Sequence, residues 1–265
     1  RAVREADGRV LLMIHGSSAT DRQWTRGGHD HGAALARDLG YVPIYLRYNS
    51  GRHVSENGAD LTEKFERVVS ELPEPIDLTI LAHSMGGLVA RSARHYGTAA
   101  GHRWIESLDN LVFVGTPHHG APLERYGNYV DYLLELTPYS APFSRLGKLR
   151  SAGITDLLYG NLLDADWEGR GRFERSGDRR HPVPLPDGVN CYAIAGTKRE
   201  TTDDLGERFH WDGMVPVDSG LGHHDDPAFD LGIPAARQRV APDNNHLGLL
   251  GSLEVYQPLK TWLGP

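Results

Sequence analysis

Short apolar runs alternate along the chain with segments of helical periodicity. Strands, most of them buried on both faces, are predicted at 10–14, 41–48, 78–82, 111–114, 190–195 and 238–240. Helical spacing predicts helices over 33–39, 61–72 and 86–96, which end at Gly40, Pro73 and Gly97. This order predicts an α/β fold, with a mostly parallel sheet and helices on both of its faces.

The stretch from Ala121 to Gly188 interrupts the alternation. It contains no strand-like run, and tyrosine and leucine recur at helical spacing as far as about Trp167. A polar stretch rich in glycine and proline follows. We therefore predict an α/β core made of 1–120 and 189–265, with a helical cap and loop inserted at 121–188. Ordinary connecting helices are the alternative interpretation.

Composition narrows the possible partners. The chain has 265 residues, enough for one large α/β domain with a substantial core. Its formal net charge of −7 and its lack of a basic tract argue against a nucleic-acid partner. No apolar run approaches the roughly 18 residues needed to span a bilayer. Cys191 is the one cysteine, which excludes an internal disulfide and favours a cytoplasmic location, with secretion left open.

The strand predicted at 78–82 ends in the sequence HSMGG, which contains a candidate nucleophile. A sharp turn between a strand and a helix lifts a serine above a sheet, and it needs small residues two positions before and after that serine. Ala82 and Gly86 meet this need for Ser84, in an A-x-S-x-G variant of the common G-x-S-x-G. The pattern predicts a nucleophilic serine, and the alternative is a serine that caps a helix.

The first predicted strand ends in His15-Gly16-Ser17, which suggests a second part of the same site. A loop at this place can turn back over the sheet and point a backbone N–H toward Ser84. We predict that the backbone N–H groups of Ser17 and Met85 form an oxyanion hole. We expect His15 itself to be structural.

An acid and a histidine should follow the nucleophile in that order along the chain. His246 is the last histidine and follows the final predicted strand, so it is the candidate base. Asp212 is favoured as the acid because it begins a tight Asp-Gly turn, and Asp218, Asp203 and Asp204 are the competitors.

Five motifs occur in a fixed order over nearly the whole chain: HGSS at 15–18, AHSMGG at 82–87, GTPHHGAP at 115–122, DGMVP at 212–216 and NHLGLL at 245–250. Together they resemble the α/β-hydrolase superfamily, specifically bacterial lipases and serine esterases similar to the GPI inositol-deacylase family. The resemblance implies hydrolysis of carboxylic esters through an acyl-serine, with Ser84, Asp212 and His246 as nucleophile, acid and base, and without a cofactor. HGSSAT departs from the glycine-rich HGxxG of the family, and the insertion is particular to this chain.

We therefore expect an esterase or lipase that acts on a small-molecule ester or lipid, with Leu134, Tyr139 and Phe143 of the cap lining the acyl pocket. A polyester depolymerase or an acyltransferase would use the same three residues. A catalytically silent hydrolase fold that binds a small molecule is the alternative of another class, and the complete Ser, Asp and His set argues against it.

No metal site is predicted, because the histidine pairs at 118–119 and 223–224 are neighbours in sequence, and such pairs rarely converge on one ion.

Overall fold

The computed structural model describes residues 8–72, 75–120, 151–169, 178–199 and 211–264. Its central sheet has six parallel strands in the order β4-β1-β5-β6-β7-β8. In chain order these strands are β1 Arg9–Ile14, β4 Val42–Leu46, β5 Asp77–His83, β6 Leu108–Val114, β7 Asn190–Gly196 and β8 Gln238–Ala241. The predicted α/β fold and all six predicted strands are confirmed.

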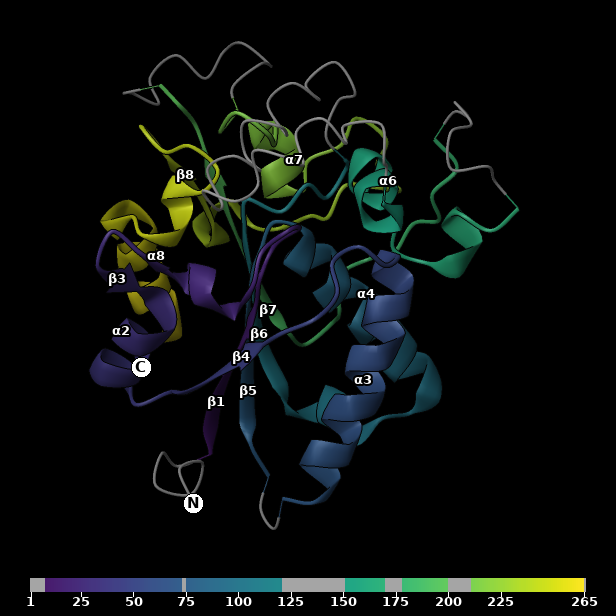
Figure 1. Ribbon diagram of the computed structural model, residues 1–265, viewed down its shortest axis with the longest axis horizontal. Helices are drawn as coiled ribbons and strands as arrows, with labels where there is room; N and C mark the ends of the chain where they lie inside the picture. Colours follow the sequence, from purple (N-terminus) through teal and green to yellow (C-terminus); the bar gives the residue numbers. More distant parts are fainter. Residues whose placement is uncertain (1–7, 73–74, 121–150, 170–177, 200–210, 265) are drawn as a thin grey trace.

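Helices cover both faces of this sheet (Figure 1). The α-helices are α2 His31–Leu39, α3 Val54–Ser70, α4 Met85–Ala100, α6 Ala152–Tyr159, α7 Val217–Leu221 and α8 Leu253–Leu263. Short 3-10 turns are η1 Asp21–Trp24, η2 Arg103–Ser107, η5 Asp164–Asp166, η6 Ala235–Arg237 and η7 Gly248–Leu250. A small antiparallel hairpin pairs β2 Thr25–Arg26 with β3 His29–Asp30.

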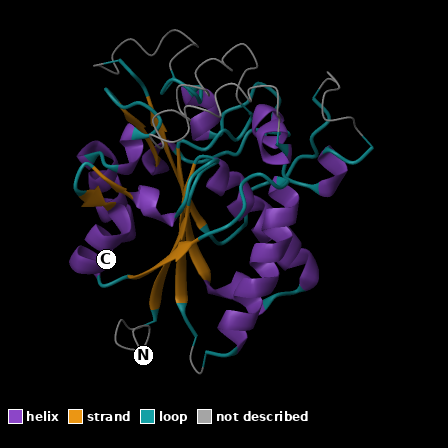
Figure 2. Cartoon of the chain, in the orientation of Figure 1, coloured by secondary structure: helices purple, strands orange, loops and turns teal. Residues whose placement is uncertain are grey.

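The strands divide the core into two layers because their side chains alternate between the faces of the sheet. In β1, Val10, Leu12 and Ile14 join the apolar cluster under α3 and α4. Leu11 and Met13 join the cluster under α2 and α8. Figure 2 shows the sheet between these two helical layers. Burial on both faces explains why the strands appear in the sequence as continuous apolar runs.

Two helix boundaries differ from the sequence prediction. Gly97 was expected to end the helix after β5, but α4 continues to Ala100 and is capped by Gly101 at φ 69°. Gly97 lies inside α4, where an added Cβ would stand 3.2 Å from the Trp104 ring and also contact Thr62. This glycine therefore allows close packing of α4 against its neighbours. α3 begins at Val54, seven residues before the start expected at 61.

The first described part of the predicted insertion is attached to the core through a buried carboxylate. Asp156 on α6 accepts hydrogen bonds from the Val54 backbone N–H at 2.8 Å and from His53 Nδ1 at 3.0 Å. It thereby supplies an acceptor for the orphan N–H groups at the start of α3. The Trp167 ring stacks on the His53 ring at 3.7 Å. The division into a core and a cap at 121–188 stays a prediction, since 121–150 and 170–177 lie outside the described residues.

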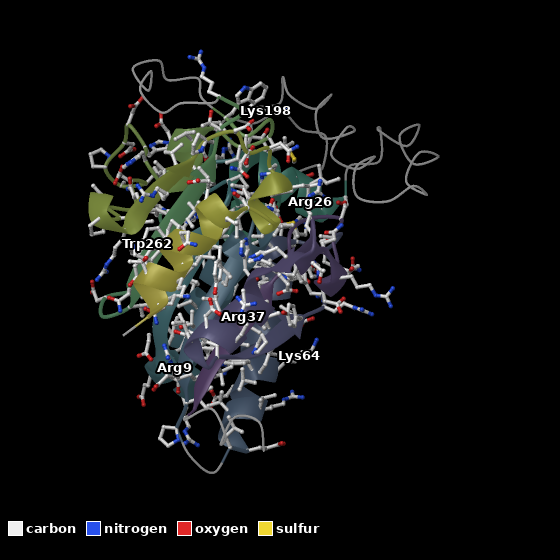
Figure 3. The ribbon with its side chains drawn as sticks, turned by 90° about the vertical axis from the view of Figure 1, so that its left-hand side faces the viewer. Arg9, Arg26, Arg37, Lys64, Lys198 and Trp262 are labelled. Carbon is white, nitrogen blue, oxygen red and sulfur yellow. The ribbon has the colours of Figure 1, made fainter. Side chains whose placement is uncertain are left out.

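All six strands run in one direction, so their carboxyl ends meet at one edge of the sheet. In Figure 3 Arg9, the first residue of β1, lies at the opposite end of the molecule from Lys198, which follows β7 by two residues. Ligand sites of open parallel sheets lie at the carboxyl edge.

Among the helices that the structure describes, none is long and apolar enough to cross a membrane.

Candidate active site

Ser84 lies directly after β5 in a strained backbone conformation. Its φ is 55° and its ψ is −127°, a combination that is unusual for any residue other than glycine. Its N–H donates to the carbonyl of Val114 on the neighbouring strand at 2.9 Å. Within the described part of the chain its side chain makes no capping hydrogen bond to α4. The geometry is therefore that of a strained strand-to-helix turn, with Ser84 itself buried at 3% exposure, and the alternative of a helix-capping serine does not apply.

Glycines on three sides explain how this turn fits against its neighbours. An added Cβ at Gly86 would stand 2.7 Å from the His15 carbonyl oxygen and even closer to that of Ile14. At Gly16 an added Cβ would stand 3.0 Å from the Ser84 Cβ. At Gly87 it would collide with the Thr116 side chain. The end of β1, the serine turn and the loop after β6 thus pack against one another with no room for a further methyl group.

Asp212 and His246 form a buried pair after β7 and β8. Asp212 Oδ2 lies 2.6 Å from His246 Nδ1, and the two side chains are 1% and 3% exposed. A carboxylate only accepts, so the imidazole Nδ1 carries the proton that it donates. The Asp212 Oδ1 accepts backbone N–H groups from Met214 and Val215, each at 2.8 Å. Together these bonds hold the carboxylate in place and fix one orientation of the imidazole.

Gly115, the residue directly after β6, further limits the position of His246. An added Cβ at Gly115 would stand 3.2 Å from His246 Cε1 and 3.3 Å from Nδ1. The ring therefore rests on the backbone just after β6, one residue beyond the Val114 carbonyl that binds Ser84. Ser84, Asp212 and His246 thus reach one edge of the sheet, as expected from the order of the strands.

Of the competing acids, Asp218 alone lies among the described residues. Asp218 is exposed at the start of α7, while Asp203 and Asp204 lie outside the described residues. The sequence favoured Asp212 through its Asp-Gly turn, and the structure places Gly213 at φ 101° in that turn.

The loop after β1 crosses over the serine turn. Tyr48 holds the start of this loop: its ring stacks on His15 at 4.3 Å, and its hydroxyl donates to the His15 carbonyl at 2.7 Å. His15 therefore has the structural role expected of it. The N–H of Ser18 donates to Ser50 Oγ at 2.9 Å. Ser17, between this bond and Gly16, is 2% exposed.

His83, which directly precedes Ser84, has a contact that sequence reasoning missed. Its Nε2 lies 3.1 Å from the carbonyl oxygen of His246. Burial, followed by the nearby His246, holds the pKa of His83 well below its usual value, so the ring is neutral. A carbonyl only accepts, so Nε2 carries the hydrogen. The only sequence signal was the position of this histidine beside the serine.

His118, the first of the two histidines after β6, is buried in a different environment. His118 Nδ1 lies 3.3 Å from Arg91 Nη1, and its ring meets Phe113 edge-on at 4.5 Å. Burial and then the charge of Arg91 keep the pKa of His118 well below its usual value. Among the described residues no group of three or more His, Cys, Asp or Glu side chains could hold a metal ion.

The arrangement as a whole defines the class of protein. A parallel sheet with a strained serine after β5, an acid after β7 and a histidine after β8 is the architecture of the α/β-hydrolase superfamily. The chain belongs to the family described as "Domain of unknown function (DUF7379)", whose model matches residues 1–159. That match includes Ser84 and ends before Asp212. No curated protein matches the chain by sequence.

Solved structures with the same fold include several hydrolases. The Bacillus licheniformis lipase BlEst2 in mature form is 15% identical, with a TM-score of 0.59, over 97% of this chain and 91% of that one. The NocB thioesterase domain, solved as a covalent complex with a fluorophosphonate nocardicin G analog, is 15% identical, with a TM-score of 0.53, over 98% and 97%. These similarities establish the fold. The resemblance to the GPI inositol-deacylase family rests on the sequence motifs alone.

Proposed function

We propose that this protein is a serine hydrolase that cleaves carboxylic esters through an acyl-serine intermediate. The observation that carries the proposal is the buried Asp212–His246 pair at the same sheet edge as the strained Ser84. A serine hydroxyl needs an oriented base beside it and a turn that lifts it above the sheet. We assign the base to the Asp212–His246 pair and the turn to the strained backbone at Ser84. The fold shared with lipase and thioesterase structures agrees with this chemistry.

In the proposed reaction Ser84 Oγ attacks the ester carbonyl while His246 Nε2 takes the hydroxyl proton. Asp212 holds the imidazole through Nδ1 and stabilises its cationic form. Backbone N–H groups of Ser17 and Met85 stabilise the oxyanion of the tetrahedral intermediate. When this intermediate collapses, the ester C–O bond breaks and His246 gives its proton to the leaving alcohol. Water then attacks the acyl-serine by the same route, which releases the acid and restores Ser84.

Substrate preference is proposed to depend on the insertion. Leu134, Tyr139 and Phe143 lie outside the described residues, and their role as the acyl-pocket wall stays a prediction. Each buried CH₂ contributes roughly 0.8 kcal/mol, so the loss of a wall side chain should change chain-length preference. The test is the ratio of kcat/KM for butyrate and decanoate esters in Leu134→Ala, Tyr139→Ala and Phe143→Ala. A ratio that stays constant in all three variants would exclude this role.

The activity itself is tested with a series of p-nitrophenyl esters from short to long acyl chains. Wild-type protein should hydrolyse at least one of them, and Ser84→Ala should lower turnover by a factor on the order of 10⁴. A fluorophosphonate should label Ser84 alone. Ser92→Ala is the matched control, because Ser92 is also buried but donates an ordinary hydrogen bond to the Leu162 carbonyl at 2.8 Å. Binding of an ester by the wild-type protein without hydrolysis would instead indicate a receptor.

A further inference from the structure

We propose that His83 is a positioning residue that sets the place of the catalytic base through the backbone of His246. The inference rests on the proposed function, in which His246 is the base. It assigns a role to a residue that is neither nucleophile, acid nor base in the proposed reaction, and that the serine-turn pattern leaves unspecified.

Strand alternation directs His83 toward the loop that carries the base. Ala82 joins the core cluster under α3 and α4, so the next side chain along β5 points to the opposite face. That face holds Leu247 and Leu249 of the base loop. Trp24 meets the His83 ring edge-on at 6.4 Å on the same face. The last residue of β5 is thus enclosed between the core and the base loop.

The hydrogen bond from His83 reaches the main chain of the base itself. Its Nε2–H donates to the His246 carbonyl at 3.1 Å, and the two rings lie 4.8 Å apart. His83 is 1% exposed, so this hydrogen bond is made in the interior of the protein. Since Ser84 is the next residue in the chain, this bond links the nucleophile turn to the base across one peptide unit.

The other side of the His83 ring faces the loop after β1. An added Cβ at Gly16 would stand 3.1 Å from His83 Nδ1 and 3.0 Å from the Ser84 Cβ. The ring therefore lies between the loop proposed to form the oxyanion hole and the loop that holds the base. One buried side chain fixes the spacing of three segments that must act together.

The side-chain bonds of His246 leave this spacing open. The contacts to Asp212 and Gly115 define the orientation of the imidazole ring. The bond from His83 adds a direct restraint on the distance between the His246 main chain and the serine turn. A misplacement of about 1 Å at a reacting group can lower a rate by about 10².

A matched pair of substitutions isolates this hydrogen bond. In His83→Gln the amide nitrogen lies at the same number of bonds from Cα as the imidazole Nε2 and keeps a donor. His83→Met has a side chain of the same length without a donor. We expect kcat for a p-nitrophenyl ester to fall about 10- to 100-fold in His83→Met and less than about threefold in His83→Gln, with KM within about twofold in both.

His31 supplies the structural control. It is also buried, and its Nε2 donates to the Leu249 carbonyl at 2.9 Å, three residues beyond the base. His31→Met and His31→Gln should differ in stability but only slightly in kcat. If the His31 pair differs in kcat as much as the His83 pair does, general stiffness of the loop is responsible and the positioning role of His83 is excluded. Equal kcat values for His83→Met and His83→Gln would also overturn it.

A spectroscopic readout separates this inference from the proposed function. The Nδ1 proton of His246, held by Asp212 at 2.6 Å, should give a strongly downfield ¹H resonance in ¹⁵N-histidine-labelled protein. We expect this resonance to move in His83→Met and to stay in place in His83→Gln. If wild-type protein hydrolyses no ester, the proposed function fails while the resonance still tests His83. An unmoved resonance in His83→Met contradicts the positioning role whatever the activity.

Discussion

Asp212 and His246 are joined twice, once through side chains and once through the backbone. Besides the 2.6 Å bond between Oδ2 and Nδ1, the backbone N–H of His246 donates to the backbone carbonyl of Asp212 at 3.0 Å. The two loops that follow β7 and β8 are therefore fixed to each other at the point where the proposed acid contacts the proposed base. The relative placement of these side chains follows from the backbone before any substrate binds.

Asp212→Asn should cut kcat/KM for a p-nitrophenyl ester by about 10³–10⁴ while the fold is kept. The N–H groups of Met214 and Val215 would hold the new amide oxygen in the Oδ1 position. The amide nitrogen then faces His246 Nδ1 and donates to it, which favours the wrong imidazole tautomer. Asp218→Asn, at an exposed position, serves as the control. A larger loss in the control would transfer the acid role to Asp218.

Ser17→Ala should keep activity within about tenfold, because the proposed donor is a backbone group and a tenfold loss is only about 1.4 kcal/mol. Ser17→Pro removes the N–H and should lower kcat by about 10²–10³, as for the loss of one oxyanion donor. Thermal unfolding of both variants controls for damage to the loop. Similar losses from the two substitutions would indicate that the Ser17 side chain acts instead.

Gly86→Ala should destabilise the protein by about 1–3 kcal/mol, the usual cost of overpacking a core. Inside a helix this substitution normally gains about 1 kcal/mol. Here the added methyl group would collide with backbone carbonyls of Ile14 and His15, which cannot swing aside. Urea unfolding measures the change in the free energy of unfolding. Gly51→Ala is the control, because the nearest atom to a Cβ added there belongs to the Asn49 side chain, at 3.1 Å. A stabilised Gly86→Ala variant would show that the packing is looser than described.

His31 should make the protein less stable as the pH falls from about 6.5 to about 4. Burial lowers the pKa of His31 in the folded protein to about 4. In the unfolded chain, where the ring is hydrated, its pKa is the ordinary 6.5. Between these values the unfolded state binds more protons, so the free energy of unfolding decreases by about 3 kcal/mol as the pH falls through this window. It levels off below about pH 4.

Urea unfolding of wild type and His31→Gln at a series of pH values tests this expectation. The amide of the variant keeps a donor for the Leu249 carbonyl and does not titrate. Carboxylates and the other histidines contribute to both curves, so the difference between the curves isolates His31. The wild-type curve should fall more steeply between pH 6.5 and 4. Parallel curves would mean that His31 does not carry the linkage.

Strands that are buried on both faces could be predicted from the sequence, because each of them is a continuous apolar run. β1, β5, β6 and β7 were recognisable for this reason. The start of α3 was missed because its first turns are largely polar and contain Gly58, which packs against Ser92 on α4. Gly97 was misread as a helix end, since a glycine that permits close packing looks the same in sequence as one that caps. α8 was not anticipated.

The candidate site was predictable to the extent that it depends on strand ends. Ser84, Asp212 and His246 each follow a strand, and their order along the chain is that of the superfamily. The sequence could not indicate that Met214 and Val215 ligate the carboxylate, because that depends on how the loop after Asp212 turns. The contact of His83 with His246 spans 163 positions, and no local pattern contains it.

The anchoring of α6 has a consequence for how this scaffold can diversify. Gly120 packs against the backbone at the end of α6, and its carbonyl accepts a hydrogen bond from Ser219 Oγ at 3.2 Å. At the other end of α6, the Gly153 N–H donates to the Gly51 carbonyl at 3.5 Å. The two attachment points of residues 121–150 are thus separated by about the length of α6, roughly 12 Å. If this segment sets substrate preference as proposed, another segment that bridges the same interval could change that preference without altering the proposed catalytic residues.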